Sequence, residues 1–68
     1  MKSVTRQESL VIVKRLVGEI GTPRLLRLMA RITEQHAHDL LRQGASHQAA
    51  RCTREATILS LASEALLN

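Results

Sequence analysis

Residues 22–43 constrain the fold more than any other part of the chain, because their apolar side chains cover more than half the circumference of a helix. Thr22 and Pro23 predict its start, since threonine is a favoured N-cap and proline loses nothing at the first helical position. Such a helix needs neighbours on two sides, which predicts packing by its own chain and by a second copy. One apolar stripe contains Leu25, Leu28, Met29, Ile32, His36 and Leu40, and the other, about 100° away, contains Leu26, Ala30, Thr33, Ala37 and Leu41. From the first stripe we predict as core or dimer contacts Leu25, Met29, Ile32, His36 and Leu40.

The polar side of this helix carries Arg24, Arg27 and Arg31 on one face, within its first two and a half turns. Cations near a helix N-terminus oppose the macrodipole and cost about 0.3–1 kcal/mol each at exposed sites. The next helix repeats the pattern with Arg51 and Arg54. Two interpretations stay open, an ordinary solvated face or a basic stripe of these five arginines that binds an anionic partner.

The segment before residue 22 favours a helix over about residues 5–20. Thr5 and Glu8 match a capping box, and Gly18 and Gly21 indicate a helix end. The β-branched residues 11–13 suit a strand equally well, and a strand followed by two helices is the plan of ribbon-helix-helix DNA-binding dimers. Apolar and polar residues do not alternate here, however, and the following helices are long for that fold, so helix is the preferred interpretation.

A third helix is predicted over about residues 46–67, after a turn at Gly44 that is short enough to force an antiparallel hairpin. One face of this helix is rich in small residues that allow close packing of two helices. The opposite face becomes apolar toward its C-terminal end, and we predict it as a dimer contact or a partner-binding patch formed by Ile58, Leu61 and Ala65.

The predicted fold is therefore all-α, with residues 1–68 forming one small helical domain. Chains of this size have marginal cores, and this one has no aromatic residue and a single cysteine, Cys52, so that no intrachain disulfide can reinforce it. Self-association is the simplest way to gain buried area, and we predict a homodimer. No segment near the start reads as a signal peptide and no apolar run is long enough to span a membrane, which predicts a soluble, cytoplasmic chain with no membrane partner.

No catalytic or cofactor-binding motif is found in the sequence, which argues against an enzyme. His36 and His38 lie about 200° apart on a helix and cannot share a metal ion. His36 is expected to be a hydrogen-bonded core histidine, with a pH-sensitive interface as the alternative. Cys52 is expected to be a small buried hydrophobe. We therefore predict no metal and no cofactor.

The segment TPRLLRLMARITEQHAHDLLRQG and the alanine-rich helix after it resemble short phage and prophage proteins built as dimeric helical hairpins, such as the quorum-sensing anti-activator proteins of Pseudomonas phages. The resemblance covers about residues 22–67, rests on helical spacing and carries over no binding residue. It implies a dimer that binds a host regulatory protein and blocks its activity. With a net charge of +4, the chain is thus predicted to be a protein-interaction module that inhibits or modulates a host regulatory or nucleic-acid-binding protein, and the alternative is a basic DNA-binding dimer of the ribbon-helix-helix or helix-turn-helix type.

Overall fold

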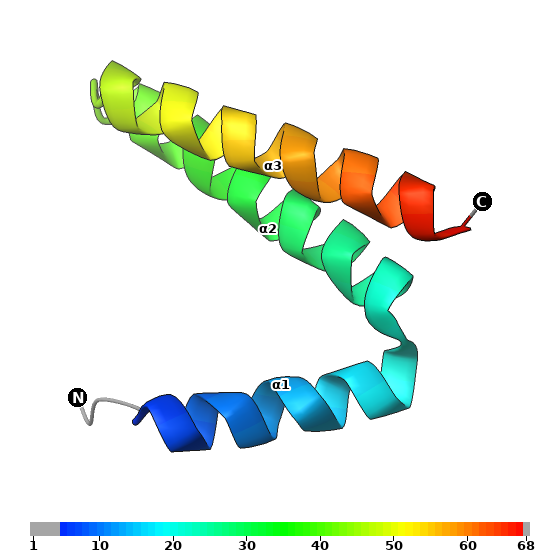
Figure 1. Cartoon of the computed structure of the whole chain (residues 1–68). Coiled ribbons are helices and arrows are strands. Elements are labelled where there is room, and N and C mark those ends of the chain that lie inside the picture. Colours follow the sequence, from blue (N-terminus) through cyan, green and yellow to red (C-terminus); the bar gives the residue numbers. More distant parts are fainter. Residues whose placement is uncertain (1–4, 68) are drawn as a thin grey trace.

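The computed structural model describes residues 5–67, which form three α-helices and no strand: α1 (Arg6–Ile20), α2 (Thr22–Arg42) and α3 (Ser46–Leu67). The all-α prediction is confirmed, and the predicted helix boundaries agree with the observed ones to within one residue. Helices α2 and α3 lie side by side and run in opposite directions, whereas α1 projects from the start of α2 as a separate arm (Figure 1). The molecule is a flat V, with principal extents of 38 × 37 × 13 Å.

The first helix begins at the predicted cap. The Thr5 hydroxyl oxygen accepts a hydrogen bond from the backbone N–H of Glu8 at 3.1 Å, which satisfies one of the free donors at the helix start. Residues 11–13 are helical despite their β-branched side chains. Because β-branching lowers helix propensity only slightly, the cap and the helical hydrogen bonds outweigh it. The ribbon-helix-helix plan, which needs a strand here, does not apply to this chain.

Gly21 alone connects α1 to α2. Its backbone N–H donates to the carbonyl of Val17 at 2.9 Å, and its own carbonyl accepts from the N–H of Leu25 at 3.0 Å. It therefore ends one helix and begins the next, in a conformation (φ 82°, ψ 153°) that is essentially restricted to glycine. Of the two glycines expected to mark the end of this helix, Gly21 does so, whereas Gly18 lies inside α1. Thr22 is likewise the first residue of α2 and not its N-cap.

The connection between α2 and α3 is a Schellman turn. The N–H of Ala45 donates to the carbonyl of Leu40 at 2.9 Å, and the N–H of Gly44 donates to the carbonyl of Leu41 at 3.0 Å. These two bonds satisfy carbonyls that the end of α2 leaves free, and they require a positive φ at Gly44, which is 81°. The turn reverses the chain within residues 43–45 and sets α3 against α2.

The core lies between α2 and α3 and is made of small side chains. The fully buried positions recur every seven residues, a spacing that keeps one side of each helix against the other along their length. At one end of this seam the buried Ser63 hydroxyl donates a hydrogen bond of 2.7 Å to the carbonyl of Pro23, which ties the end of α3 to the start of α2. The buried residues are Ala30 and Ala37 of α2 and Ala49, Ala56 and Ser63 of α3.

Helix α2 thus buries the stripe that contains Ala30 and Ala37, and not the stripe with the larger side chains that we predicted as core. In the single chain, Leu25 and Leu40 are half-buried, whereas Met29, Ile32 and His36 are exposed. The physical reason is the small-residue face of α3, which meets the small-residue stripe of α2 and leaves the larger side chains outside the seam. A role for these five residues in a dimer remains a prediction.

Helix α1 adds little to the packed part of the molecule, because none of its side chains is buried. The radius of gyration is 13.8 Å, whereas a compact domain of this length has one of about 11 Å. The solvent-accessible surface is 5929 Å², whereas a folded monomer of 7.6 kDa exposes about 4,300 Å². A single copy of the chain therefore leaves uncovered a large area that compact proteins bury. Within residues 5–67, none of the helices has the length and apolar character needed to cross a membrane.

Candidate functional site

Three arginines of the predicted basic stripe surround one hollow of about 500 Å³. Arg24, Arg27 and Arg31 project from the first half of α2, and the spacing of three and four residues places them on one side of the helix. The antiparallel arrangement brings the last residue of α3, Leu67, to the same place. The hollow is lined by Pro23, Arg24, Arg27, Leu28, Arg31 and Leu67.

The charge of this hollow is not neutralised by the surrounding residues that the structure describes. Arg24, Arg27 and Arg31 are exposed, and none of them forms an ion pair within residues 5–67. The first turn of α2 contains no acidic residue, and its unpaired N–H groups add the positive end of the helix dipole. Guanidinium groups bind carboxylates and phosphates through paired hydrogen bonds, so this end of the hairpin is suited to an anionic group.

Apolar side chains lie among these arginines. Leu28 is 40% exposed and Leu67 is 60% exposed, and Pro23 is half-buried beside them. Exposed leucines contribute to binding when a partner removes them from water, at about 25 cal/mol per Å² of apolar area covered. The hollow therefore presents two kinds of contact, three fixed positive charges around its rim and an apolar surface between them.

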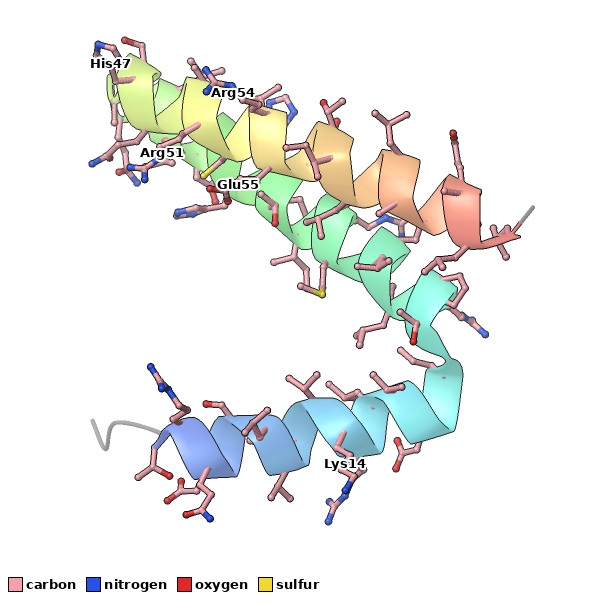
Figure 2. All side chains as sticks on the ribbon, viewed as in Figure 1. Lys14, His47, Arg51, Arg54 and Glu55 are labelled. Carbon is pink, nitrogen blue, oxygen red and sulfur yellow. The ribbon has the colours of Figure 1, made fainter. Side chains whose placement is uncertain are left out.

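Arg51 and Arg54 do not belong to this surface. Arg54 lies about 20 Å along the axis of α3 from Leu67. Figure 2 shows His47 and Arg54 on the edge of α3 that faces away from α1, with Arg51 and Glu55 on the edge nearer to α1. The predicted basic stripe of five arginines is therefore divided between separate surfaces of the hairpin, and only three of them share a hollow.

The predicted apolar patch lies on the outer face of α3. Ile58 and Leu61 are each 60% exposed, and Ala65 is exposed as well. These three residues follow each other at three- and four-residue spacing, which places them on one side of the helix, away from the buried alanines. They are separate from the arginine hollow, and their role as a partner-binding or dimer patch remains a prediction.

His36 is not the buried, hydrogen-bonded core histidine that we expected, because its side chain is exposed and none of the hydrogen bonds described for residues 5–67 involves it. It lines a shallow hollow of about 320 Å³ between α2 and α3, together with Leu40, Arg51, Cys52 and Glu55 among others. This placement puts His36 and Leu40 on the same flank of the hairpin as Arg51 and Glu55, the flank nearer to α1 (Figure 2).

Cys52 is a free, half-buried thiol on the flank of the helix seam, in partial agreement with the expected small hydrophobe. In the part of the chain that the structure describes, no three His, Cys, Asp or Glu side chains gather closely enough to hold a metal ion. The one ion pair described there joins Arg42 to Asp39, three residues apart and exposed on α2. An exposed pair of this kind contributes little to stability, and it leaves the arginine hollow untouched.

The contribution of Leu67 and Pro23 to the arginine hollow was not predicted. A signal for it does exist in the sequence, because an antiparallel hairpin with a short turn must place the end of the third helix beside the start of the second. Pairing residue numbers from the turn at Gly44 outward would have brought residues 65–67 next to residues 22–24.

Comparisons of the chain with protein-family models, with curated proteins and with solved structures find no match.

Proposed function

We propose that the chain is a small homodimeric interaction module of a phage or mobile element, which acts in the cytoplasm and inhibits or modulates a host regulatory or nucleic-acid-binding protein. In this proposal it binds an acidic surface of that protein through the hollow formed by Arg24, Arg27 and Arg31. The observation that carries the proposal is the grouping of three exposed arginines, without ion-pair partners among residues 5–67, around one hollow.

The composition of the hollow favours an acidic protein segment over a nucleic acid. A phosphate backbone needs only cations and polar donors, whereas this hollow also presents Leu28 and Leu67 to solvent. A peptide segment or helix with carboxylates beside an apolar side chain would pair with the arginines and cover both leucines. Arginine is also among the residues enriched at the energetic centres of protein interfaces.

A basic DNA-binding dimer is the second candidate. Supporting it are the net charge of +4 and a second group of basic side chains on α3, Arg51 and Arg54, outside the arginine hollow. Two groups of arginines on one helical hairpin could contact phosphates of the same DNA duplex. The single residue between α1 and α2 is shorter than the three- or four-residue turn of a helix-turn-helix, so this candidate rests on backbone contacts alone.

A charge-matched pair of variants tests the proposal. Arg24→Ala combined with Arg27→Ala removes two positive charges at the hollow, and Arg51→Ala combined with Arg54→Ala removes two elsewhere. Tagged wild-type chain and both variants are used to capture proteins from a nuclease-treated bacterial lysate, and captured proteins are identified by mass spectrometry. We expect a protein that the wild type and the Arg51/Arg54 variant retain and that the Arg24/Arg27 variant loses.

The same three proteins are titrated with a random-sequence DNA duplex at several salt concentrations. Under the proposal, binding to the duplex is weak at physiological salt and both variants weaken it equally, because each removes two charges. Tight binding with a steep salt dependence, together with a nuclease-treated lysate that yields no specific protein, would show that DNA is the partner. Loss of the captured protein in both variants alike would show that net charge, and not the hollow, determines binding.

A further inference from the structure

The first helix carries an apolar stripe that has almost no partner in its own chain. The stripe consists of Leu10, Val13, Leu16, Val17 and Ile20, of which only Leu16 and Ile20, near the vertex of the V, are half-buried. Lys14 points away from the hairpin (Figure 2), and Leu16 lies about 200° around the helix from it, whereas Leu10 and Val17 lie within about 60° of Lys14. The stripe therefore runs along one side of the arm, with its Leu16 edge turned toward the inner side of the V. A 15-residue helix is marginally stable in water without packing.

The hairpin has a matching apolar face on its inner side, which we call the hairpin face: Leu25, Met29, Ile32, His36 and Leu40 of α2. Ile32, at its centre, is 65% exposed. The face contains no lysine or arginine, so it is distinct from the arginine hollow in chemistry as well as in position. An apolar stripe and an apolar face of similar length are thus both uncovered in one chain.

The arm cannot cover the hairpin face of its own chain. Two antiparallel helices that pack side by side need a connection of about two to five residues, and α2 and α3 use residues 43–45 for theirs. Between α1 and α2 there is only Gly21, and the hydrogen bonds of both helices extend to it. Folding α1 back along α2 would require both helices to unwind at this point, so the occupant must come from another chain.

A second copy of this chain fits the uncovered area. Two separate copies expose about 11,900 Å², twice the surface of one. A folded protein of twice the mass exposes about 7,100 Å². Reaching that value requires burying about 4,700 Å² in total, which lies within the range of obligate homodimers. The area left open by one chain is therefore what a tightly joined dimer would cover.

We propose that two copies exchange their α1 arms, so that the arm stripe of each copy packs on the hairpin face of the other. A two-fold axis makes both contacts identical, as in most homodimers, and closes the assembly at two chains. The inference rests on the dimer of the proposed function and specifies which segments form it. It leaves the arginine hollow, which neither surface includes, free on both copies.

Two pairs of matched substitutions test the contact, with mass measured by multi-angle light scattering at micromolar concentrations. The wild type is expected at about twice 7.6 kDa. Val13→Lys on the arm stripe and Ile32→Glu on the hairpin face should each weaken the dimer by at least about 100-fold, because each buries a charge in an apolar contact. Their controls are Val11→Lys, on the other side of α1, and Ile58→Glu, on the outer face of α3.

The controls are close matches in exposure. Val11 is 59% exposed against 49% for Val13, and Ile58 is 60% exposed against 65% for Ile32. Both control variants should remain dimers with a dissociation constant within about threefold of the wild type. If Ile58→Glu gives monomers while Ile32→Glu stays dimeric, the outer face of α3 forms the dimer and the arm exchange is wrong. A wild type that is monomeric across this range also overturns it.

Mixing the two weakened variants separates a lost contact from a failure to fold. In the mixed dimer the wild-type arm of the Ile32→Glu chain meets the wild-type hairpin face of the Val13→Lys chain, and the two introduced charges are opposite and fall in the second contact. We expect the mixture to form a dimer at concentrations where each variant alone is a monomer. If the mixture stays monomeric while both variants retain helical circular dichroism, the arm does not bind the partner's hairpin face.

A longer connection provides an independent test that removes no side chain. Inserting four residues, Gly-Ser-Gly-Ser, after Gly21 gives the arm enough chain to fold back on its own hairpin, and the intramolecular contact then competes at an effective concentration near millimolar. The dimer should weaken at least 100-fold while helix content is kept. An unchanged dissociation constant would show that the short connection does not cause the exchange. Arg24→Ala with Arg27→Ala should still dimerise, so failure of the arginine proposal is recognisable separately.

Discussion

The same substitution at two glycines three residues apart should change stability in opposite directions. Gly18 lies inside α1, and a Cβ atom built on it meets nothing within 4 Å. Gly21 has φ 82° and ψ 153°, a conformation that side chains with a Cβ rarely adopt. Gly18→Ala and Gly21→Ala add the same methyl group in the same part of the chain, so the difference between them reports on backbone conformation alone.

The expected magnitudes follow from these two conformations. Alanine is favoured over glycine in a helix interior by about 0.8–1.0 kcal/mol, so Gly18→Ala should raise the free energy of unfolding by roughly that amount. At Gly21 the strained backbone costs about 1–3 kcal/mol. The lower entropy of the unfolded alanine chain offsets about 0.4–1 kcal/mol of that cost. The two variants should therefore differ by about 1–3.5 kcal/mol, or by roughly 4–28 °C in Tm for a domain of this size.

Thermal unfolding followed by circular dichroism at 222 nm measures the difference. All samples need the same protein concentration, because the Tm of a dimer depends on it. Urea unfolding midpoints provide a check at constant temperature. A Gly21→Ala variant as stable as the wild type, or a shift of both variants in the same direction, would refute the view that Gly21 is held in a conformation reserved for glycine and that it alone sets the direction of the arm.

Three further substitutions test the local structure. Ala37→Leu should lower the free energy of unfolding by about 1–3 kcal/mol, since Ala37 is 3% exposed in the seam, whereas Ala50→Leu on the exposed side of α3 should change it by less than about 0.5 kcal/mol in the same urea titration. Thr5→Ala removes the cap of α1 and should lower the free energy of unfolding by about 1 kcal/mol, whereas Thr5→Ser should keep most of that stability. Faster amide hydrogen exchange at Glu8 in the alanine variant alone would confirm the cap. Gly44→Ala places a Cβ at φ 81° and should cost about 1–2 kcal/mol in thermal unfolding, and Gly44→Asn should cost less, because asparagine adopts positive φ more readily; equal losses would contradict the Schellman turn.

The helices could be predicted from the sequence because their ends depend on neighbouring residues. The Thr5 cap, Pro23 in the first turn of α2 and Gly44 after its end each act within one helical turn, so their effects are visible in the sequence. The errors at Gly18 and Thr22 are of the same local kind. Glycine suits a helix end and threonine suits an N-cap, as we predicted for Gly18 and Thr22. Gly21, however, both ends α1 and begins α2, which leaves Gly18 and Thr22 inside helices.

Which stripe of α2 is buried could not be predicted from α2 alone. Its two apolar stripes are both continuous along the helix, and the larger side chains of the one that contains Ile32 made it the better candidate for the core. Only the pairing with α3 determines which stripe of α2 is buried. The small residues Ala30 and Ala37 pack against small residues of α3, which are Ala49, Ala56 and Ser63. The exposure of His36 follows from the same choice.

The sequence by itself determined three helices, their boundaries and a set of exposed arginines, since these follow from short-range hydrogen bonding and from helical spacing. The tertiary structure decided how those residues combine. Antiparallel pairing brings Leu67 to Arg24, Arg27 and Arg31, and it leaves Arg51 and Arg54 outside the hollow that these three arginines share. The one-residue connection at Gly21 holds α1 away from the hairpin, because two helices that pack side by side in opposite directions need about two to five connecting residues. Both apolar surfaces are therefore left open to a second chain.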